Sequence, residues 1–449
     1  MAVIEQQRYT CAIGALQSVV AIPGAIPILH SGPGCGEMVS QFFEFSSGTT
    51  GGATSPCTNF SENEVVFGGE QRLEEVIRHS YDILNSDLQV VLTGCTAAIV
   101  GDDAKQVVSR FAGQGKPIVY LDTPGFKCSN LAAHEELVIA IIEQYVKKVK
   151  KAQKNRDPRR REAGKRVNLF ASVPSQDPLW KGNLIELKRL LEGEGLSVNV
   201  LFGSYSKGVR EWETIPDANF NVLVSSWCGL PIVEYLEREF SQPYFHFPYF
   251  PIGGNETTKF LREVFDFAER QGAGLDAAVL EKYISEEENA FYDEIDVLAT
   301  FLLEFRYGLP SFTHIIGNAE YVTGISKFLL NEVGIVPREQ FISDNPPEQH
   351  IERLRALVEG ISDTRKIEVF IDPDAGKAQE RIAGLEYGER GLLIGSGWDR
   401  KLAADKGYDF LPLGVPSLCR LPLTARYVGY TGGLRLIEDI YDRVLDTYR

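Results

Sequence analysis

Three cysteines near the start of the chain have the placement of a metal-cluster site. Cys35 ends a glycine-rich loop, HSGPGC, that follows the apolar run AIPIL, and Cys95 follows a second apolar run, LQVVLTG. Cys11 precedes both. Ligands of α/β sheets collect at strand ends, and thiolates are the usual ligands of iron–sulfur clusters. A four-cysteine site needs one thiolate more, so this trio predicts half of a shared site.

The loop around Cys35 is suited to a bulky inorganic group. Gly32 and Gly34 let the backbone approach such a group closely, and their N–H groups can donate to bridging sulfides. We therefore predict that both glycines belong to a cofactor site, although glycine turns also simply reverse chains. A third loop, DTPGFKCS, follows another apolar run and carries Cys128 as a further possible ligand. Loops after successive parallel strands meet at one edge of a sheet. Buried cysteines scattered through the chain would not be expected to meet there.

Other polar residues near these loops have simpler explanations. Free cysteine is among the most buried residue types, so we interpret Cys57, Cys228 and Cys419 as packing side chains. We interpret His30 as a packed residue or a donor to the site, and not as a metal ligand. The aspartates of the GDD segment, residues 101–103, are expected to cap the next helix.

Charge is distributed unevenly along the 449 residues. The net charge is −16, yet residues 147–166 hold eleven Lys or Arg against Asp157 and Glu162, a local charge of +9. Subtracting this run from the net charge leaves −25 for the rest of the chain. The run lacks interleaved aromatic residues, so we interpret residues 151–165 as a solvated basic linker. A body this acidic repels DNA, and we expect no nucleic-acid partner.

The composition also limits the compartment. No run approaches the ~18 apolar residues of a membrane-spanning helix, and the start, MAVIEQQRYT, lacks a cationic segment followed by an apolar core. Seven cysteines, an odd number, argue against a disulfide framework. We expect a cytoplasmic protein with no membrane partner.

Short apolar runs alternate with helical patterns along nearly the whole chain, which predicts an α/β fold with parallel sheets flanked by helices. Strands are predicted at residues 25–29, 88–93, 117–122, 167–172, 198–202, 221–226, 313–317, 367–372 and 391–395. Helices are predicted at 71–85, 130–149, 256–271, 275–305, 433–449 and 346–359, the last with Asn345 as N-cap. The predicted domains are a cluster-binding unit at 1–150, the linker, a second unit at 166–305, and a third at 306–449 that ends in a helix.

Nucleotide-binding motifs are absent from the sequence. No GxxxxGK[ST] loop occurs, and no GxGxxG opens a plausible dinucleotide-binding turn. Any nucleotide-driven step would therefore belong to a partner protein.

The combined motifs resemble the cluster-binding pattern of nitrogenase component 1 subunits. Cys11, Cys35 within HSGPGC and Cys95 within TGCTAAIVGDD have that family's spacing, and TNFSENEVVFGGEQRL is similar to its segment between the second and third cysteines. The resemblance covers essentially the whole chain and implies three Rossmann-like domains. It also implies that these three cysteines bind an [8Fe-7S] P-cluster shared with an α subunit.

The resemblance is to β-type subunits. FPIGGNETTKFL and the tail LGVPSLCRLPLTARYVGYTGGLRLIEDI look like the β-type pattern. In α-type subunits a middle-domain cysteine and a C-terminal histidine hold the catalytic cofactor. No histidine lies beyond His350, and Cys228 falls a few residues past the ligand position. The resemblance therefore implies a catalytic iron–sulfur cofactor in the partner chain.

Two departures separate the chain from the molybdenum-enzyme β subunits. The HSGPGC loop lacks the glutamine that those enzymes show before the final glycine. Gly125 replaces a serine that ligates the oxidised P-cluster there, and Cys128 lies close enough to substitute for it. These departures resemble the nitrogenase-like branch that includes methylthio-alkane reductases, which cleave carbon–sulfur bonds of small thioethers.

The resemblance implies a β subunit that relays electrons from an ATP-dependent [4Fe-4S] reductase protein to an α-type subunit within an α2β2 assembly. Reductive cleavage of thioethers is the expected reaction. One alternative is dinitrogen reduction with a vanadium or iron-only cofactor, and another is a scaffold for cofactor assembly. Scaffold subunits of this type tend to lack some of the three cysteines, which disfavours the last.

Overall fold

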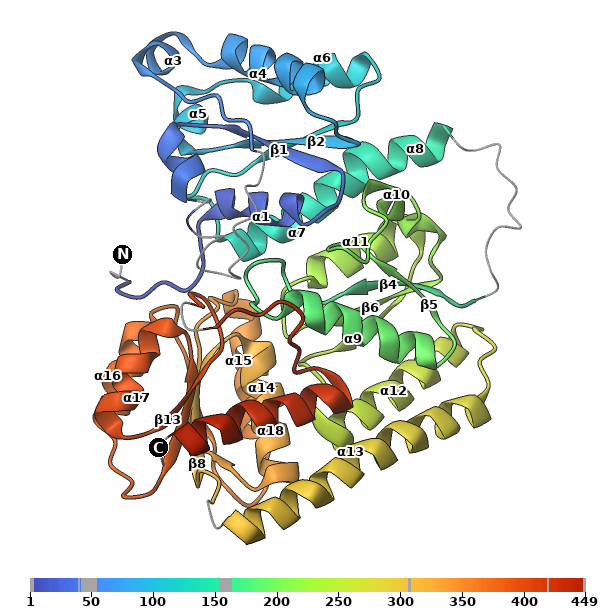
Figure 1. Ribbon diagram of the computed structural model, residues 1–449. Coiled ribbons are helices and arrows are strands. Elements are labelled where there is room, and N and C mark those ends of the chain that lie inside the picture. The colour runs from blue at the N-terminus through green and yellow to red at the C-terminus, as the bar shows by residue number, and fades with distance from the viewer. Residues whose placement is uncertain are drawn as a thin grey trace.

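The computed structural model describes residues 4–38, 41, 55–152, 164–305, 308–417 and 420–446. Three parallel sheets follow one another along the chain, and helices pack against their faces (Figure 1). The predicted strands all form, with ends shifted by no more than two residues. The α/β fold class is confirmed.

The first sheet has three strands in the order β1-β2-β3. His30, Thr93 and Asp122 are paired across it, so the three strands end at the same level. The elements of this part of the chain are η1 (Ala12–Ala15), α1 (Leu16–Val20), β1 (Ala25–His30), α3 (Glu62–Phe67), α4 (Glu70–Ile83), β2 (Leu88–Thr93), α5 (Cys95–Val100), α6 (Ala104–Gly113), β3 (Ile118–Asp122), α7 (Asn130–Ile141), the π-helical turn η2 (Ile142–Val146) and α8 (Lys147–Ala152).

The second sheet has the order β5-β4-β6-β7, which places the first strand of this unit in the interior. Its interior strands are almost fully buried, as expected of a parallel sheet covered on both faces. The elements are β4 (Arg166–Phe170), α9 (Trp180–Gly193), β5 (Ser197–Val200), α10 (Val209–Trp212), η4 (Ile215–Asp217), β6 (Phe220–Val224), α11 (Leu230–Phe240), β7 (Tyr244–Phe247), α12 (Gly253–Arg270) and α13 (Ala277–Phe305).

The third sheet has the order β11-β10-β8-β12-β13, and β9 pairs with β8 beside this path. The elements are β8 (Phe312–Gly317), α14 (Ala319–Phe328), the π-helical turn η5 (Leu329–Val333), β9 (Val336–Pro337), β10 (Glu339–Ile342), α15 (Glu348–Glu359), β11 (Glu368–Ile371), α16 (Ala375–Ala383), β12 (Gly391–Gly395), η6 (Gly397–Asp399), α17 (Arg400–Lys406), β13 (Asp409–Pro412) and α18 (Gly429–Asp446).

The units are joined by a shared core and by helices that cross between them. One buried cluster includes residues from Ala12 in the first unit to Ile440 in the last helix. The C-terminal helix α18 packs against α12 and α13, which belong to the second unit (Figure 1). The N-terminal end of the chain extends from the first unit to the third unit (Figure 1).

The structure corrects one helix start and adds strands. Asn345 is not the N-cap of α15: it has a φ of +56°, and the residue before Glu348 is Pro347, whose side chain makes no capping hydrogen bond. Pro346 and Pro347 disfavour helical backbone in the residues that precede them. The strands β7, β9, β10 and β13 were not predicted, because they are short and carry polar or proline residues.

Residues 153–163 of the predicted basic linker lie outside the described part of the chain. Among the helices that are described, none combines the length and the apolar character needed to cross a membrane.

Candidate metal centre

The predicted site residues come together at the carboxyl edge of the first sheet. Cys35 lies in a helical turn, residues 33–38, after β1, and Cys95 is the first residue of α5, directly after β2. Gly125 lies in the loop after β3. Since the three strands end at one level, their loops meet there, as the strand order predicts.

Cys11 reaches this edge by a different route. It precedes the short helix η1 and forms an isolated antiparallel bridge with Ser129. Thr10 donates its N–H to Asn130 Oδ1 at 3.1 Å and accepts the Asn130 N–H at 2.9 Å. These bonds fix Cys11 beside the loop that carries Cys128.

Gly125 lies against the thiols of Cys11 and Cys95. Its N–H donates to Cys95 Sγ at 3.0 Å. A Cβ at this position would lie 2.9 Å from Cys11 Cβ, 3.1 Å from Cys11 Sγ and 3.4 Å from Cys95 Sγ. The serine implied for this position in molybdenum-enzyme β subunits has no room here unless a thiol moves.

Cys35 has its own hydrogen-bond donor. The Ser31 hydroxyl donates to Cys35 Sγ at 3.3 Å. Ser31 also faces Cys57, whose thiol lies 3.5 Å from the Ser31 carbonyl oxygen, and Cys57 is itself held beside β1 by a bridge to Leu29. The half-buried Cys57 therefore packs against the loop, in agreement with its interpretation as a packing residue.

The thiols of Cys11 and Cys35 border an open hollow of about 560 Å³. Its lining is mainly apolar and comes from both ends of the chain: Tyr9, Ile13, Met38, Trp398, Val415 and Pro416 are among its residues. A hollow of this kind beside unpaired thiols leaves room for a group that one chain holds only in part.

The chemistry of the donor set fits an iron–sulfur cluster better than a single ion. Among the residues that the structure describes, no three His, Cys, Asp or Glu side chains converge where one metal ion could be held. In an iron–sulfur cluster the thiolates bind different iron atoms, so they must share an edge without converging on one point. Partial burial raises the pKa of Cys11, and the neighbouring thiols of Cys95 and Cys35 raise it further, so binding a metal would release its proton.

The remaining predicted residues differ in how the structure places them. Cys128 lies next to the Cys11–Ser129 bridge, and burial raises the pKa of its thiol. Among the described residues, an added Cβ would meet only Thr96 Oγ1 at 3.9 Å at Gly32 and nothing within 4 Å at Gly34, so no described neighbour requires glycine at either position. Their role toward a cofactor stays a prediction.

The side chains interpreted as structural are packed. His30 is fully buried, with Nε2 3.1 Å from Asp102 Oδ2 and its ring edge-on to Phe60. Asp103 caps α6 through the Gln106 N–H, as predicted for the GDD segment. Cys228 is buried, with Sγ 3.8 Å from the Leu131 carbonyl oxygen. Cys419 lies outside the described residues.

Sequence reasoning missed a donor to one thiol and a long-range ion pair just before Cys11. Ser31 is adjacent to the glycine loop, and a hydroxyl four residues before a cysteine was the available signal. Arg8, which precedes Cys11 by three residues, forms a buried ion pair with Asp399, 391 positions away. Nothing in the local sequence indicates that distant partner.

An α/β redox protein with a thiol-lined sheet edge is the class that this fold and this site define. The family model described as nitrogenase component 1 type oxidoreductase matches residues 10–445. The chain belongs to that family, as a β-type member.

Known relatives agree with this assignment. The nitrogenase molybdenum-iron protein beta chain of Rippkaea orientalis is 23% identical over 97% of this chain and 82% of its own length, and that of Methanococcus maripaludis is 24% identical over 98% and 94%. One of the light-independent protochlorophyllide reductase chains of a Picosynechococcus species is 23% identical over 85% and 71%. The solved structure "Nitrogenase Cp1 at pH 6.5" has the same fold, with a TM-score of 0.76 and 20% identity over 100% of this chain and 94% of that one.

Proposed function

We propose that this chain is the electron-relay β subunit of a nitrogenase-like two-component reductase. The observation that carries the proposal is the meeting of Cys11, Cys35 and Cys95 at one sheet edge, where two of them open into an apolar hollow. Thiolates that share an edge and face an open hollow suit a cluster completed by a second subunit.

Cys11, Cys35 and Cys95 would hold an [8Fe-7S] P-cluster shared with an α-type subunit, with Gly32 and Gly34 in the adjoining loop. The cluster would supply one-electron storage and transfer. The chain itself tunes the ligands: the Gly125 N–H and the Ser31 hydroxyl donate to two of the sulfurs. Hydrogen bonds to ligand sulfur withdraw electron density and are expected to favour the reduced state.

Cys128 is proposed as an additional ligand in place of the serine that Gly125 replaces. It follows Gly125 by three residues and lies beside the Cys11–Ser129 bridge. The catalytic iron–sulfur cofactor would belong to the α subunit, since Cys228 is packed in the core of this chain and no histidine follows His350.

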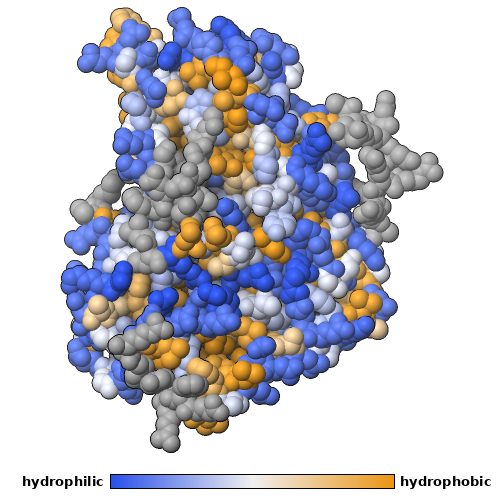
Figure 2. Space-filling view, viewed as in Figure 1, coloured by the Kyte–Doolittle hydropathy of each residue, from blue (hydrophilic) through white to orange (hydrophobic). Residues whose placement is uncertain are grey.

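An exposed apolar patch supports docking of a separate reductase protein. Its members lie on α3, on α5 and directly after Gly125: Val65, Val66, Phe67, Ile99 and Phe126, each at least half exposed. Hydrophobic side chains gather at this α3 corner at the top of the molecule (Figure 2). Exposed apolar patches mark interaction sites, and this one borders the thiol edge. An ATP-dependent [4Fe-4S] protein bound there would deliver electrons close to the ligands.

The proposed reaction is reductive cleavage of a small thioether. Two electrons and two protons convert R–S–CH3 to RH and CH3SH, so one C–S bond breaks while one C–H and one S–H bond form. The departures in the HSGPGC loop and at Gly125 favour this branch. Dinitrogen reduction is the second candidate, favoured by the molybdenum-iron relatives.

The test is anaerobic co-purification with the α-type partner, followed by analysis of iron and heterometal and by parallel assays with a thioether and with dinitrogen. Methanethiol formation that depends on ATP and the reductase is expected. Ammonia formation without thioether cleavage would overturn the thioether branch.

Two variants test the proposal that Cys35 is a ligand. Cys35→Ala is expected to remove most of the iron and the electron transfer, whereas Cys57→Ala, a neighbouring packed thiol, should retain both. If Cys35→Ala keeps full iron content and activity, the relay assignment is wrong.

A further inference from the structure

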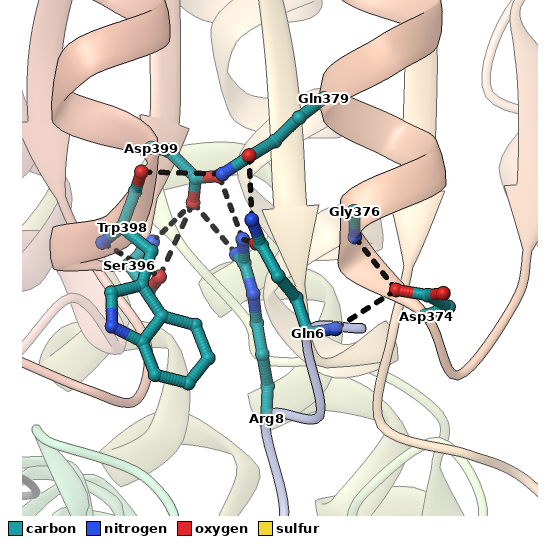
Figure 3. Close-up of polar contacts among 8 residues, drawn as sticks. All are labelled: Gln6, Arg8, Asp374, Gly376, Gln379, Ser396, Trp398 and Asp399. Carbon is teal, nitrogen blue, oxygen red and sulfur yellow. Dashed lines mark hydrogen bonds and ion pairs between the residues drawn. The ribbon is translucent and has the colours of Figure 1, made fainter. Parts of the chain in front are cut away.

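The N-terminal segment, residues 5–11, connects the third unit to the first ligand cysteine. Figure 3 shows its residues Gln6 and Arg8 pointing into a polar cluster formed by α16 and by the loop and turn after β12. Cys11 follows Arg8 by three residues. Because the connection is so short, the position of Arg8 constrains the position of Cys11 if the segment is held at both ends.

The third-unit end of this segment is fixed by two carboxylates. Asp374 accepts the N–H groups of Glu5 at 3.1 Å and Gln6 at 3.0 Å. Arg8 forms a two-pronged pair with Asp399, with Nη1–Oδ2 2.7 Å and Nη2–Oδ1 2.6 Å. The side chains are only 5% and 0% exposed, so this pair is shielded from water and salt.

Asp399 has hydrogen-bond partners other than Arg8. It accepts the Ser396 N–H at 2.7 Å and the Gln379 side-chain amide at 2.7 Å. Gln379 in turn accepts a hydrogen bond from the Gln6 side chain at 2.7 Å (Figure 3). The anchor is therefore preorganised, and the segment docks onto it.

The Cys11 end is fixed by the other two units. Gln176 of the second unit donates to the Arg8 carbonyl oxygen at 2.7 Å and accepts from the Asn130 side chain at 2.6 Å. Asn130, the first residue of α7, accepts the Thr10 N–H at 3.1 Å. Hydrogen bonds to all three units therefore converge on the six residues from Gln6 to Cys11.

The opposite side of the segment faces an open hollow. Residues from Gln7 to Cys11 line the hollow that also exposes Cys35 and Trp398. Cys11 is exposed on that side, and the described contacts that hold it are the polar ones above together with its backbone bridge to Ser129.

We propose that Arg8, through its buried pair with Asp399, is a positioning residue that holds the Cys11 thiolate in register with the other ligand thiolates. The inference rests on the proposed function for its cluster readout. It assigns to the third unit a direct role at the thiol edge of the first.

The test uses the anaerobically purified complex with the α-type partner and the variants Arg8→Gln and Arg8→Lys. The matched control is Arg390→Gln, which breaks another two-pronged pair in the third unit, Arg390–Asp409, away from the segment. Two readouts are compared: hydrogen exchange at the Gln6 and Thr10 amides, and the midpoint potential of the iron–sulfur centre followed by EPR.

Arg8→Gln leaves a buried carboxylate without its charge partner, so we expect exchange at Thr10 to rise by about tenfold or more and the midpoint potential to shift. Arg8→Lys keeps the charge without the fork and is expected to give a smaller change in both. If Arg8→Gln does not assemble, Arg8→Lys supplies the decisive comparison. Arg390→Gln should change neither.

Exchange that rises only at Gln6, with Thr10 unchanged, would overturn the inference, because the anchor would not reach Cys11. A potential that shifts equally in Arg390→Gln would overturn it as well. Absence of any iron–sulfur centre from the wild-type complex would instead contradict the proposed function, while the exchange measurement would still test the segment.

Discussion

At Gly125 the absence of a side chain decides where two sulfur atoms can lie. An added Cβ would lie 2.9 Å from Cys11 Cβ and 3.4 Å from Cys95 Sγ. The first distance is shorter than real Cβ contacts allow. Overpacking of this kind costs about 1–3 kcal/mol, which the site would relieve by displacing a thiol. We predict that Gly125→Ala loses most of its iron, as measured by metal analysis of the purified complex.

The matched control is Gly113→Ala. Gly113 lies at the end of α6, where an added Cβ meets nothing within 4 Å. This variant should keep the wild-type iron content and gain slightly in stability, because alanine favours helix over glycine. Equal iron loss in both variants would show that the effect at Gly125 is not local.

Residue types and spacing were enough to predict that Cys11, Cys35 and Cys95 meet at one sheet edge, because loops after parallel strands converge there; their role as ligands stays a prediction. They did not predict what fixes those thiols. The Ser31 hydroxyl bond is local but has no strong sequence signature, and the Arg8–Asp399 pair joins residues at opposite ends of the chain. Such a pair exists only once the three units have come together.

At the scale of elements, α18 approaches α12 through glycine. A Cβ on Gly433 would lie 2.7 Å from Gly253 Cα and 3.3 Å from Phe328 Cε2. Backbone cannot yield as a flexible side chain would, so Gly433→Ala must separate the two helices. We predict a loss of about 1–3 kcal/mol in stability, seen as a lower Tm.

Gly384→Ala is the control for that prediction. Gly384 directly follows α16, where an added Cβ would be in ordinary contact with the Arg381 carbonyl oxygen at 3.5 Å. Its Tm should stay near the wild-type value. A Gly433→Ala protein with unchanged Tm would mean that α18 and α12 are not closely packed in solution.

A carboxylate from the third unit makes the start of α12 sensitive to pH. Glu332 of η5 accepts the N–H groups of Gly254 at 2.8 Å and Asn255 at 3.2 Å. Burial raises its pKa from 4.5 to about 7, although these two hydrogen bonds act in the opposite direction. Between these values the folded protein retains a proton that the unfolded chain has lost, so stability falls as pH rises through this window.

We predict that Glu332→Gln removes this pH dependence. The free energy of unfolding of the variant should rise relative to that of the wild type between pH 5 and about 7.5, by an amount on the order of 1 kcal/mol, since the group is only partly shielded from solvent. The change with pH is the test, because the substitution also alters the hydrogen bonds. Glu359→Gln, at an exposed position of α15, should show a constant difference at all pH values. Parallel curves of stability against pH for Glu332→Gln and the wild type would contradict the prediction.

Apolar runs predicted the long buried strands well, because a parallel sheet covered on both faces requires them. The short strands were missed where proline or charged residues interrupt the run, as at Glu339 and Pro412. The start of α15 was misplaced because the sequence shows an asparagine before prolines, but not that its backbone would turn left-handed at Asn345.

At the scale of the whole molecule, the thiol edge lies at one end of the first sheet, and the other two units reach it through the segment before Cys11. The strand order accounts for convergence of the loops, but the contacts between units depend on side chains hundreds of residues apart. The domain boundaries stay a prediction, since a single buried cluster continues through all three units.

The exposed patch on α3 and α5 provides the last prediction. Phe67 is 82% exposed at the end of α3, which contacts α5, the helix that begins with the proposed ligand Cys95. A large aromatic residue at the centre of an interface often accounts for more than 1 kcal/mol of binding. If the reductase protein docks here, Phe67→Ser should lower reductase-dependent turnover by about tenfold, with iron content and α-chain co-purification unchanged.

Ile83→Ser is the matched control, since Ile83 is 79% exposed in the same unit. It ends α4 shortly before β2 begins, which places it toward the amino edge of the sheet, opposite the thiols. Its turnover should equal that of the wild type over a titration of reductase protein. Loss of α-chain co-purification in Phe67→Ser would mean that the α subunit covers the patch instead. Equal turnover in both variants would mean that electrons enter the complex elsewhere, because an apolar docking surface must lose affinity when its most exposed aromatic side chain is removed.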